Sequence, residues 1–229
     1  PMDFEEYLLA SGNTQLIEFI KTSFKNNTPM PFHTVAMEYF DDFIMTGGMP
    51  EAVDVMLKKK NRLFTMPVYN KILDSYRKEI GMLDNLIDIT RCNEVLDSIP
   101  FQLQKQNRKF QYGLIKLGSR SKDYDKSISF LHNNNLAYKC YKISDVKSPL
   151  SSCKDPESFK LYMNDTGVLF YQMHLNQNKF LNNYDMKNIV YENCIAINLL
   201  NAGYGLYYYQ SEGKAEISFV IQTRAGRII

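Results

Sequence analysis

The feature that most restricts the fold is a change of hydrophobic spacing along the 229-residue chain. Through residues 1–99, apolar side chains recur at the three- and four-residue spacing of helices, most clearly in residues 63–80. Strand-like runs appear only later, at residues 137–143, 159–163, 205–210 and 215–222. This order predicts an α+β fold.

Three regions are expected: 1–99, 100–175 and 176–229. The first is helical, and the segment Ser98-Ile99-Pro100 marks the first boundary. In the second, a short helix at residues 114–117 should lead into a corner at Gly118, and Ser121 should cap a second helix. Helix, corner, helix and then a two-stranded ribbon is the winged helix-turn-helix pattern.

The third region predicts a helix at about residues 188–200, followed by two strands that are joined by a turn at 211–214. A further strand is predicted to begin at the last three residues. This order predicts an α/β unit that is incomplete within the chain.

Positive charge is concentrated between residues 101 and 150. That segment holds ten Lys or Arg residues against three Asp, a net charge of +7, whereas the remainder carries −5. A local basic excess is typical of a surface that faces a polyanion such as DNA, and also of an ordinary solvated face. The phosphate-contacting candidates are Arg108, Lys109, Arg120, Lys122 and Lys126. Asp123 and Asp125 lie among these bases and weaken the DNA interpretation.

Several local patterns resemble one family. The chain contains PMDFEEYLLASG at residues 1–12, DDFIMTGGMPEAV at 41–53 and SIPFQLQKQNRKFQY at 98–112. It continues with FKLYMNDTGVL at 159–169, YENCIAINLL at 191–200 and EISFVI at 216–221. In this order the patterns are similar to the C-terminal region of prokaryotic AAA-type ATPases, a domain of unknown function that follows the ATPase module.

The resemblance implies that an ATPase domain, which binds ATP and Mg²⁺, precedes residue 1 in the parent protein. It implies a winged helix in the middle and a truncated restriction-endonuclease-like, PD-(D/E)XK-type unit at the end. The chain itself has no GxxxxGK[ST] motif, so we expect no cofactor and no ATPase site within it. The leading hypothesis is a DNA-binding accessory region of the ATPase. The rival is a protein-interaction module that docks on its own ATPase domain or on another subunit.

A metal-dependent nuclease is the third hypothesis. By the resemblance, Glu192 and Glu216 match the helix and strand glutamates of a nuclease metal site. Ser218 stands where the family carries an aspartate, and a neutral hydroxyl is a poor Mg²⁺ ligand. The E-x-K expected after Ile229 is not in the chain. We therefore expect this region to be non-catalytic.

The cysteines, the histidines and the length of the apolar runs restrict the kinds of site and the cellular location that we expect. Four cysteines and three histidines show no metal-ligand spacing, so no metal site is predicted from them. No apolar run approaches the roughly 20 residues of a membrane-spanning helix. A cytoplasmic protein with reduced cysteines and no membrane partner is therefore expected.

Overall fold

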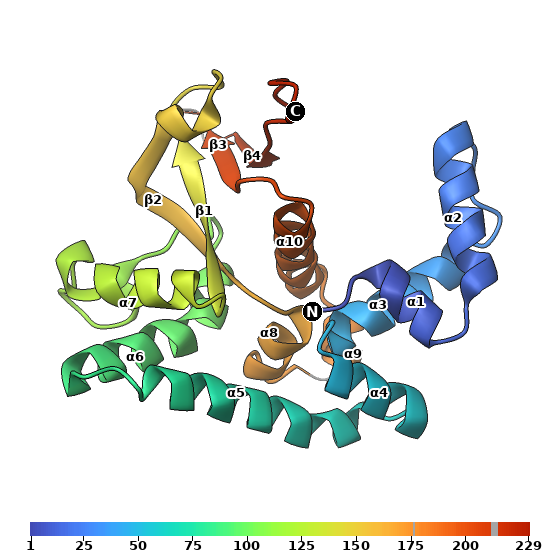
Figure 1. The fold of residues 1–229 in the computed structure, drawn as a ribbon, viewed down its shortest axis with the longest axis horizontal. Coiled ribbons are helices and arrows are strands. Elements are labelled where there is room, and N and C mark those ends of the chain that lie inside the picture. Colours follow the sequence, from blue (N-terminus) through green and yellow to red (C-terminus); the bar gives the residue numbers. More distant parts are fainter. Residues whose placement is uncertain (176, 212–214) are drawn as a thin grey trace.

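A computed structural model describes residues 1–175, 177–211 and 215–229. These residues form an α+β arrangement, as the hydrophobic spacing predicts. The first half is helical and comprises α1 (Phe4–Ala10), α2 (Thr14–Asn26), α3 (His33–Thr46), α4 (Pro50–Lys59), the 3₁₀ turn η1 (Arg62–Thr65), α5 (Met66–Ile80) and α6 (Leu86–Leu103). Figure 1 shows α5 and α6 along the lower edge of the molecule, with α2 projecting upward at the end where α1, α3 and α4 lie.

Helix α6 runs through the boundary predicted at Ser98–Pro100, so the predicted break is wrong. Proline removes one hydrogen bond from a helix, but the packing here compensates for that loss. Ile99 and Leu103 are fully buried, and Gln102 exchanges two hydrogen bonds with the backbone of Gln111. Tertiary contacts therefore hold the last turn of α6 in place.

The short helix predicted at residues 114–117 is a single 3₁₀ turn, η2 (Tyr112–Leu114). Leu117 is 96% exposed, so this segment buries no apolar face that could stabilise a longer helix. Gly118 has a φ of +83° and turns the chain as expected. Helix α7 (Ser121–Asn133) then begins one residue earlier than a Ser121 cap would place it, because Arg120 occupies the N-cap and Ser121 is the first helical residue.

The strands form one four-stranded sheet in the order β2-β1-β3-β4. Its members are β1 (Ala137–Ile143), β2 (Lys154–Met163), β3 (Tyr207–Gln210) and β4 (Glu216–Val220). β1 pairs antiparallel with β2 and parallel with β3, and β3 pairs antiparallel with β4. The predicted ribbon is thus half of a larger sheet, whose other strands follow the division proposed at residue 175. Apart from Ser211, the turn predicted at residues 211–214 lies outside the described residues.

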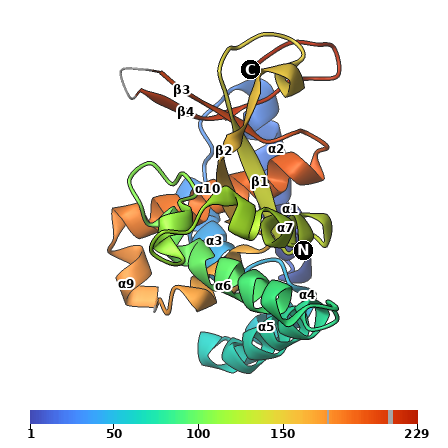
Figure 2. The ribbon, with the colours of Figure 1, turned by 90° about the vertical axis from the view of Figure 1, so that its left-hand side faces the viewer.

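The remaining elements are η3 (Leu150–Cys153), α8 (Thr166–Gln172), α9 (Gln177–Leu181) and α10 (Tyr184–Asn201). α6 and α7 pack on the β1–β2 hairpin, and α10 contacts β2 between the sheet and the N-terminal helices (Figures 1 and 2). One hydrophobic cluster joins all three predicted regions, from Ala52 through Ile128 to Tyr208. This shared core fixes α7, β2 and α10 relative to one another.

Candidate functional site

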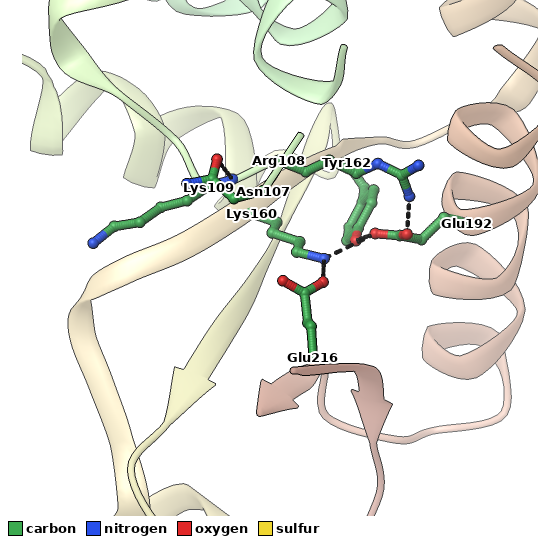
Figure 3. A network of polar contacts seen from close by, with 7 residues as sticks. All are labelled: Asn107, Arg108, Lys109, Lys160, Tyr162, Glu192 and Glu216. Atoms are coloured by element: carbon green, nitrogen blue, oxygen red, sulfur yellow. Dashed lines mark hydrogen bonds and ion pairs between the residues drawn. The ribbon is translucent and has the colours of Figure 1, made fainter. Parts of the chain in front are cut away.

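A buried polar cluster lies where β2, α10 and β4 meet. Strand β2 contributes Lys160 and Tyr162, α10 contributes Glu192, and β4 contributes Glu216 (Figure 3). The Lys160 Nζ lies 3.1 Å from Glu192 Oε1 and 2.5 Å from Glu216 Oε1. The exposed fraction of the side chain is 0% for Lys160, 10% for Glu192 and 23% for Glu216. One ammonium group therefore bridges the two predicted glutamates.

Two further side chains complete the coordination of Glu192. Arg108, which precedes η2 and α7, forms an ion pair with Glu192 Oε2. The Tyr162 hydroxyl donates a hydrogen bond to Oε1 of the same carboxylate. Lys160 and Tyr162 are two residues apart in β2 and therefore point to the same face of the sheet (Figure 3). Both oxygens of the buried carboxylate are thus paired.

The charges in this cluster balance, because two cations, Arg108 and Lys160, face two glutamates. Burial lowers the pKa of Lys160, while the hydrogen bond and charge of Glu216 act in the opposite direction. Burial likewise raises the pKa of the Tyr162 hydroxyl well above its ordinary value, which keeps this group a hydrogen-bond donor. The cluster is a compensated ion network of the kind that tolerates burial.

This arrangement does not fit the divalent cation of a nuclease. A metal site needs several carboxylates that converge with free lone pairs, but the Lys160 ammonium already occupies the space between Glu192 and Glu216. Within residues 1–175, 177–211 and 215–229, no three His, Cys, Asp or Glu side chains form a group that could hold a metal ion. Ser218, on β4, adds no charge.

The five predicted DNA contacts fall into two groups. Arg108 is held by Glu192, and the Lys109 ammonium donates to Ser158 Oγ at 2.9 Å. The other three, which occupy the N-cap and first turns of α7, are exposed and form no ion pair with the described residues: Arg120, Lys122 and Lys126.

Helix α7 buries one face and exposes the opposite one. Its buried side chains include Tyr124, Ile128 and Leu131, which pack toward α6 and β1. At 100° per residue, Lys122 and Lys126 lie on the side opposite to these apolar residues. The helix therefore presents two unpaired ammonium groups, one turn apart, to solvent.

Both acidic residues among these bases have intramolecular partners. Asp123 accepts a hydrogen bond from the Arg120 backbone N–H at 3.0 Å and lies 3.7 Å from the Arg91 guanidinium. Asp125 accepts a hydrogen bond from the Tyr112 hydroxyl at 3.1 Å. The Arg91 pair compensates one of the two negative charges, so the sequence alone overstates how far they offset the basic side chains.

Sequence reasoning missed Lys160 and Tyr162, although one signal was available. Lys160 is the only charged residue in the run FKLYM at residues 159–163, which is otherwise apolar and strand-forming. A lysine at such a position requires a buried counter-charge. That requirement predicts an acidic partner for Lys160, and the structure identifies the partners as Glu192 and Glu216.

Two of the motifs quoted above are packing junctions. The Asp165 carboxylate accepts hydrogen bonds from the backbone N–H groups of Gly48 at 2.7 Å and Val168 at 3.0 Å. A Cβ on Gly47 would lie 2.3 Å from Asp165 Oδ1, and one on Gly167 would lie 2.4 Å from the Thr46 carbonyl oxygen. The turn between α3 and α4 therefore contacts the start of α8 too closely for any residue larger than glycine.

A scan against family models gives one match, to a family described as Domain of unknown function (DUF8612), over residues 37–179. This match covers more than half of the chain. The chain belongs to this family. No curated protein and no solved structure matched the sequence.

The DUF8612 match places the cluster across the edge of the family domain. The matched residues, 37–179, include Arg108, Lys160 and the whole of α7, whereas Glu192 and Glu216 follow the last matched residue. In the described part of the chain, no helix has both the length and the apolar character that a membrane crossing requires.

Proposed function

We propose that this chain is the DNA-binding accessory region of a prokaryotic AAA-type ATPase. The observation that carries the proposal is that Lys122 and Lys126 share the solvent side of α7, with Arg120 exposed at its N-cap, and that none of the three has an ion-pair partner among the described residues. Cations that are not compensated within the fold are available to phosphate groups. Ammonium groups one turn apart on a solvent-facing helix suit contacts with the DNA backbone.

Lys109 and Arg108 take different roles in this proposal. Lys109 is half-buried and contacts Ser158, so it extends the basic face toward β2. Arg108 is committed to Glu192, and we assign it a positioning role for the segment that precedes α7. The order of α6, α7 and the β1–β2 hairpin supports a winged-helix-like DNA-binding domain. A long connection at residues 104–120 stands between the two helices in place of a tight corner.

Salt dependence gives the sharpest test. Each phosphate contact contributes about −0.9 to the slope of log affinity against log salt. Fluorescence anisotropy with a labelled 20-base-pair duplex should show binding at about 50 µM protein and low salt, within the range of non-specific association. The variant Lys122→Gln/Lys126→Gln should bind more weakly and lower the slope by about 2.

A matched control removes the same charge elsewhere. Lys25 on α2 and Lys78 on α5 are exposed, so Lys25→Gln/Lys78→Gln should retain the wild-type slope. An equal loss of DNA affinity in both double variants would mean that net charge, and not the position of Lys122 and Lys126, determines the affinity. Absence of binding to any duplex at low salt would reject the proposal.

A protein-interaction module remains the alternative, because the N-terminal arm exposes aromatic side chains. Phe24 is 90% exposed, Phe32 is 48% exposed, and Phe32 lies 5.0 Å from Phe19 between ring centroids. Exposed aromatic clusters are typical of protein contacts. Under this alternative the arm docks on the ATPase domain of the same parent protein. Phe24→Ser/Phe32→Ser would then weaken co-purification of the two domains without changing DNA affinity.

The AAA parentage rests on the resemblance of the quoted motifs. In the proposal, ATP and Mg²⁺ bind the ATPase domain, and nucleotide turnover there alters how α7 engages DNA. A GxxxxGK[ST] motif upstream of residue 1 in the reading frame would support this parentage, and an upstream sequence without one would contradict it.

A metal-dependent nuclease is the least favoured function, since Lys160 neutralises the candidate carboxylates. It would be revived by Mg²⁺-dependent nicking of a supercoiled plasmid that is lost in Glu192→Gln.

A further inference from the structure

A cavity of about 610 Å³ lies at the corner where α4, η1 and α5 meet α8. This volume falls within the range of small-molecule sites, about 300–1,000 Å³. None of the residues of the ion cluster or of the basic face of α7 line it. The cavity is therefore independent of the DNA-binding proposal.

The walls of the cavity are mostly apolar. Met45, Met56 and Met66 line it together with Leu63 and Phe170. Methionine side chains are flexible and polarisable, so they adapt to apolar groups of different shape. Leu63 is 69% exposed and Met66 is 46% exposed, which leaves apolar surface uncovered at the entrance. The chemistry of the walls fits an apolar body.

Arg62 lines the same cavity, and one of its N–H donors has no acceptor among the described residues. Its Nη1 donates to Gln177 Oε1 at 2.9 Å, and its Nη2 forms an ion pair with Asp42. Its Nε–H is buried and has no partner in the described part of the chain. A buried donor without an acceptor is costly, and an incoming oxygen atom would remove that cost.

Two lining residues adopt left-handed backbone conformations. Lys60 ends α4 and His174 follows the end of α8, each with a φ of 51°, as is common at helix C-termini. Lys60 also has no ion pair with the described residues. Asp42 compensates Arg62, so Lys60 leaves the cavity with one positive charge in excess.

We propose that this cavity binds a small amphipathic carboxylate. The apolar body of the ligand lies among the three methionines, a carboxylate oxygen accepts from Arg62 Nε–H, and Lys60 balances the negative charge. A ligand with one charge and one apolar end matches the cavity better than a polar metabolite or a cation.

The experiment uses 4-phenylbutyrate as the probe and protein labelled with ¹³C at the methionine methyl groups. Titration at pH 7.5 should shift the methyl signals of Met45, Met56 and Met66 saturably, with a Kd on the order of 1 mM or tighter. Met82 is 81% exposed in the α5–α6 connection and serves as the internal control. Its signal should not move.

Head-group controls and one cavity-filling variant complete the test. 4-Phenylbutan-1-ol and 4-phenylbutylamine should bind at least about 10-fold more weakly, because neither supplies an anionic oxygen. Met66→Trp places a larger side chain at a rim position that is 46% exposed, and should abolish the shifts at Met45 and Met56. Equal binding of the amine, equal shifts at Met82, or no saturation by about 20 mM probe would overturn the proposal.

Discussion

Replacing Lys160 by methionine would test whether the buried cluster is an ion network that stabilises the fold. Methionine keeps most of the volume of the side chain, replaces one methylene by sulfur and removes the ammonium group. Breaking a buried ion pair by removing one partner costs about 3–5 kcal/mol. Glu192 would keep Arg108 and Tyr162, whereas Glu216 would lose the only ion-pair partner it has among the described residues.

Because the Glu216 side chain is 23% exposed, water can partly replace the lost ammonium. We therefore expect the lower end of that range, about 3 kcal/mol. Urea unfolding followed by circular dichroism measures this loss. With a slope of about 3 kcal/mol/M, the midpoint should fall by about 1 M.

The double variant Lys160→Met/Glu216→Gln removes the stranded charge as well, and should recover at least about 1 kcal/mol. Lys126→Met, on the exposed face of α7, is the matched control and should change stability by no more than about 0.5 kcal/mol. A Lys160→Met protein as stable as the wild type, or a double variant less stable than the single one, would refute the reasoning.

Three further outcomes are expected. Gly167→Ala places a Cβ 2.4 Å from the Thr46 carbonyl oxygen and should lower the free energy of unfolding by about 1–3 kcal/mol in urea melts. Burial, aided by the Lys139 charge, lowers the pKa of His132, so the unfolded chain binds this proton more tightly. Stability should consequently fall as pH drops below about 6.5, and less steeply in His132→Gln, by thermal unfolding across pH. Arg108→Gln leaves the buried Glu192 with fewer partners and should lower the urea midpoint, whereas Lys105→Gln, exposed in the same segment, should not.

Local periodicity predicted most elements, because each helix or strand carries its own apolar stripe. α5 and α10 lie close to the predicted ranges 63–80 and 188–200, and β1 coincides with the predicted run 137–143, whereas β2 begins five residues before the run predicted at 159–163. The course of α6 through Pro100 was not predictable from local rules, since burial of Ile99 and Leu103 overrides the lost hydrogen bond. The parallel pairing of β1 with β3 also depends on packing between distant segments.

In the candidate site, too, the sequence predicts some residues but not the contacts between distant segments. Glu192 and Glu216 were singled out by resemblance, but nothing in their spacing shows that Lys160 lies between them. Arg108 was assigned to phosphate because it belongs to a basic segment, and only the tertiary structure reveals its buried partner. A count of charged residues along the sequence cannot distinguish a cation that faces solvent from one that is already paired. The lysines of α7, in contrast, can be placed on the outer face of the helix from helical spacing alone.

The buried cluster also fixes the segment that precedes α7. Arg108, Lys109 and Phe110 are consecutive, and each is fixed by a different contact: an ion pair with Glu192, a hydrogen bond to Ser158, and a backbone hydrogen bond to Phe159 at 2.8 Å. These contacts attach the segment before α7 to β2 and α10 at once. Because Glu192 belongs to α10, that helix takes part in holding this segment. Under the proposed DNA-binding function, Glu192→Gln should therefore loosen the segment before α7 and lower DNA affinity in the anisotropy assay, whereas the loss of a negative charge alone would raise it.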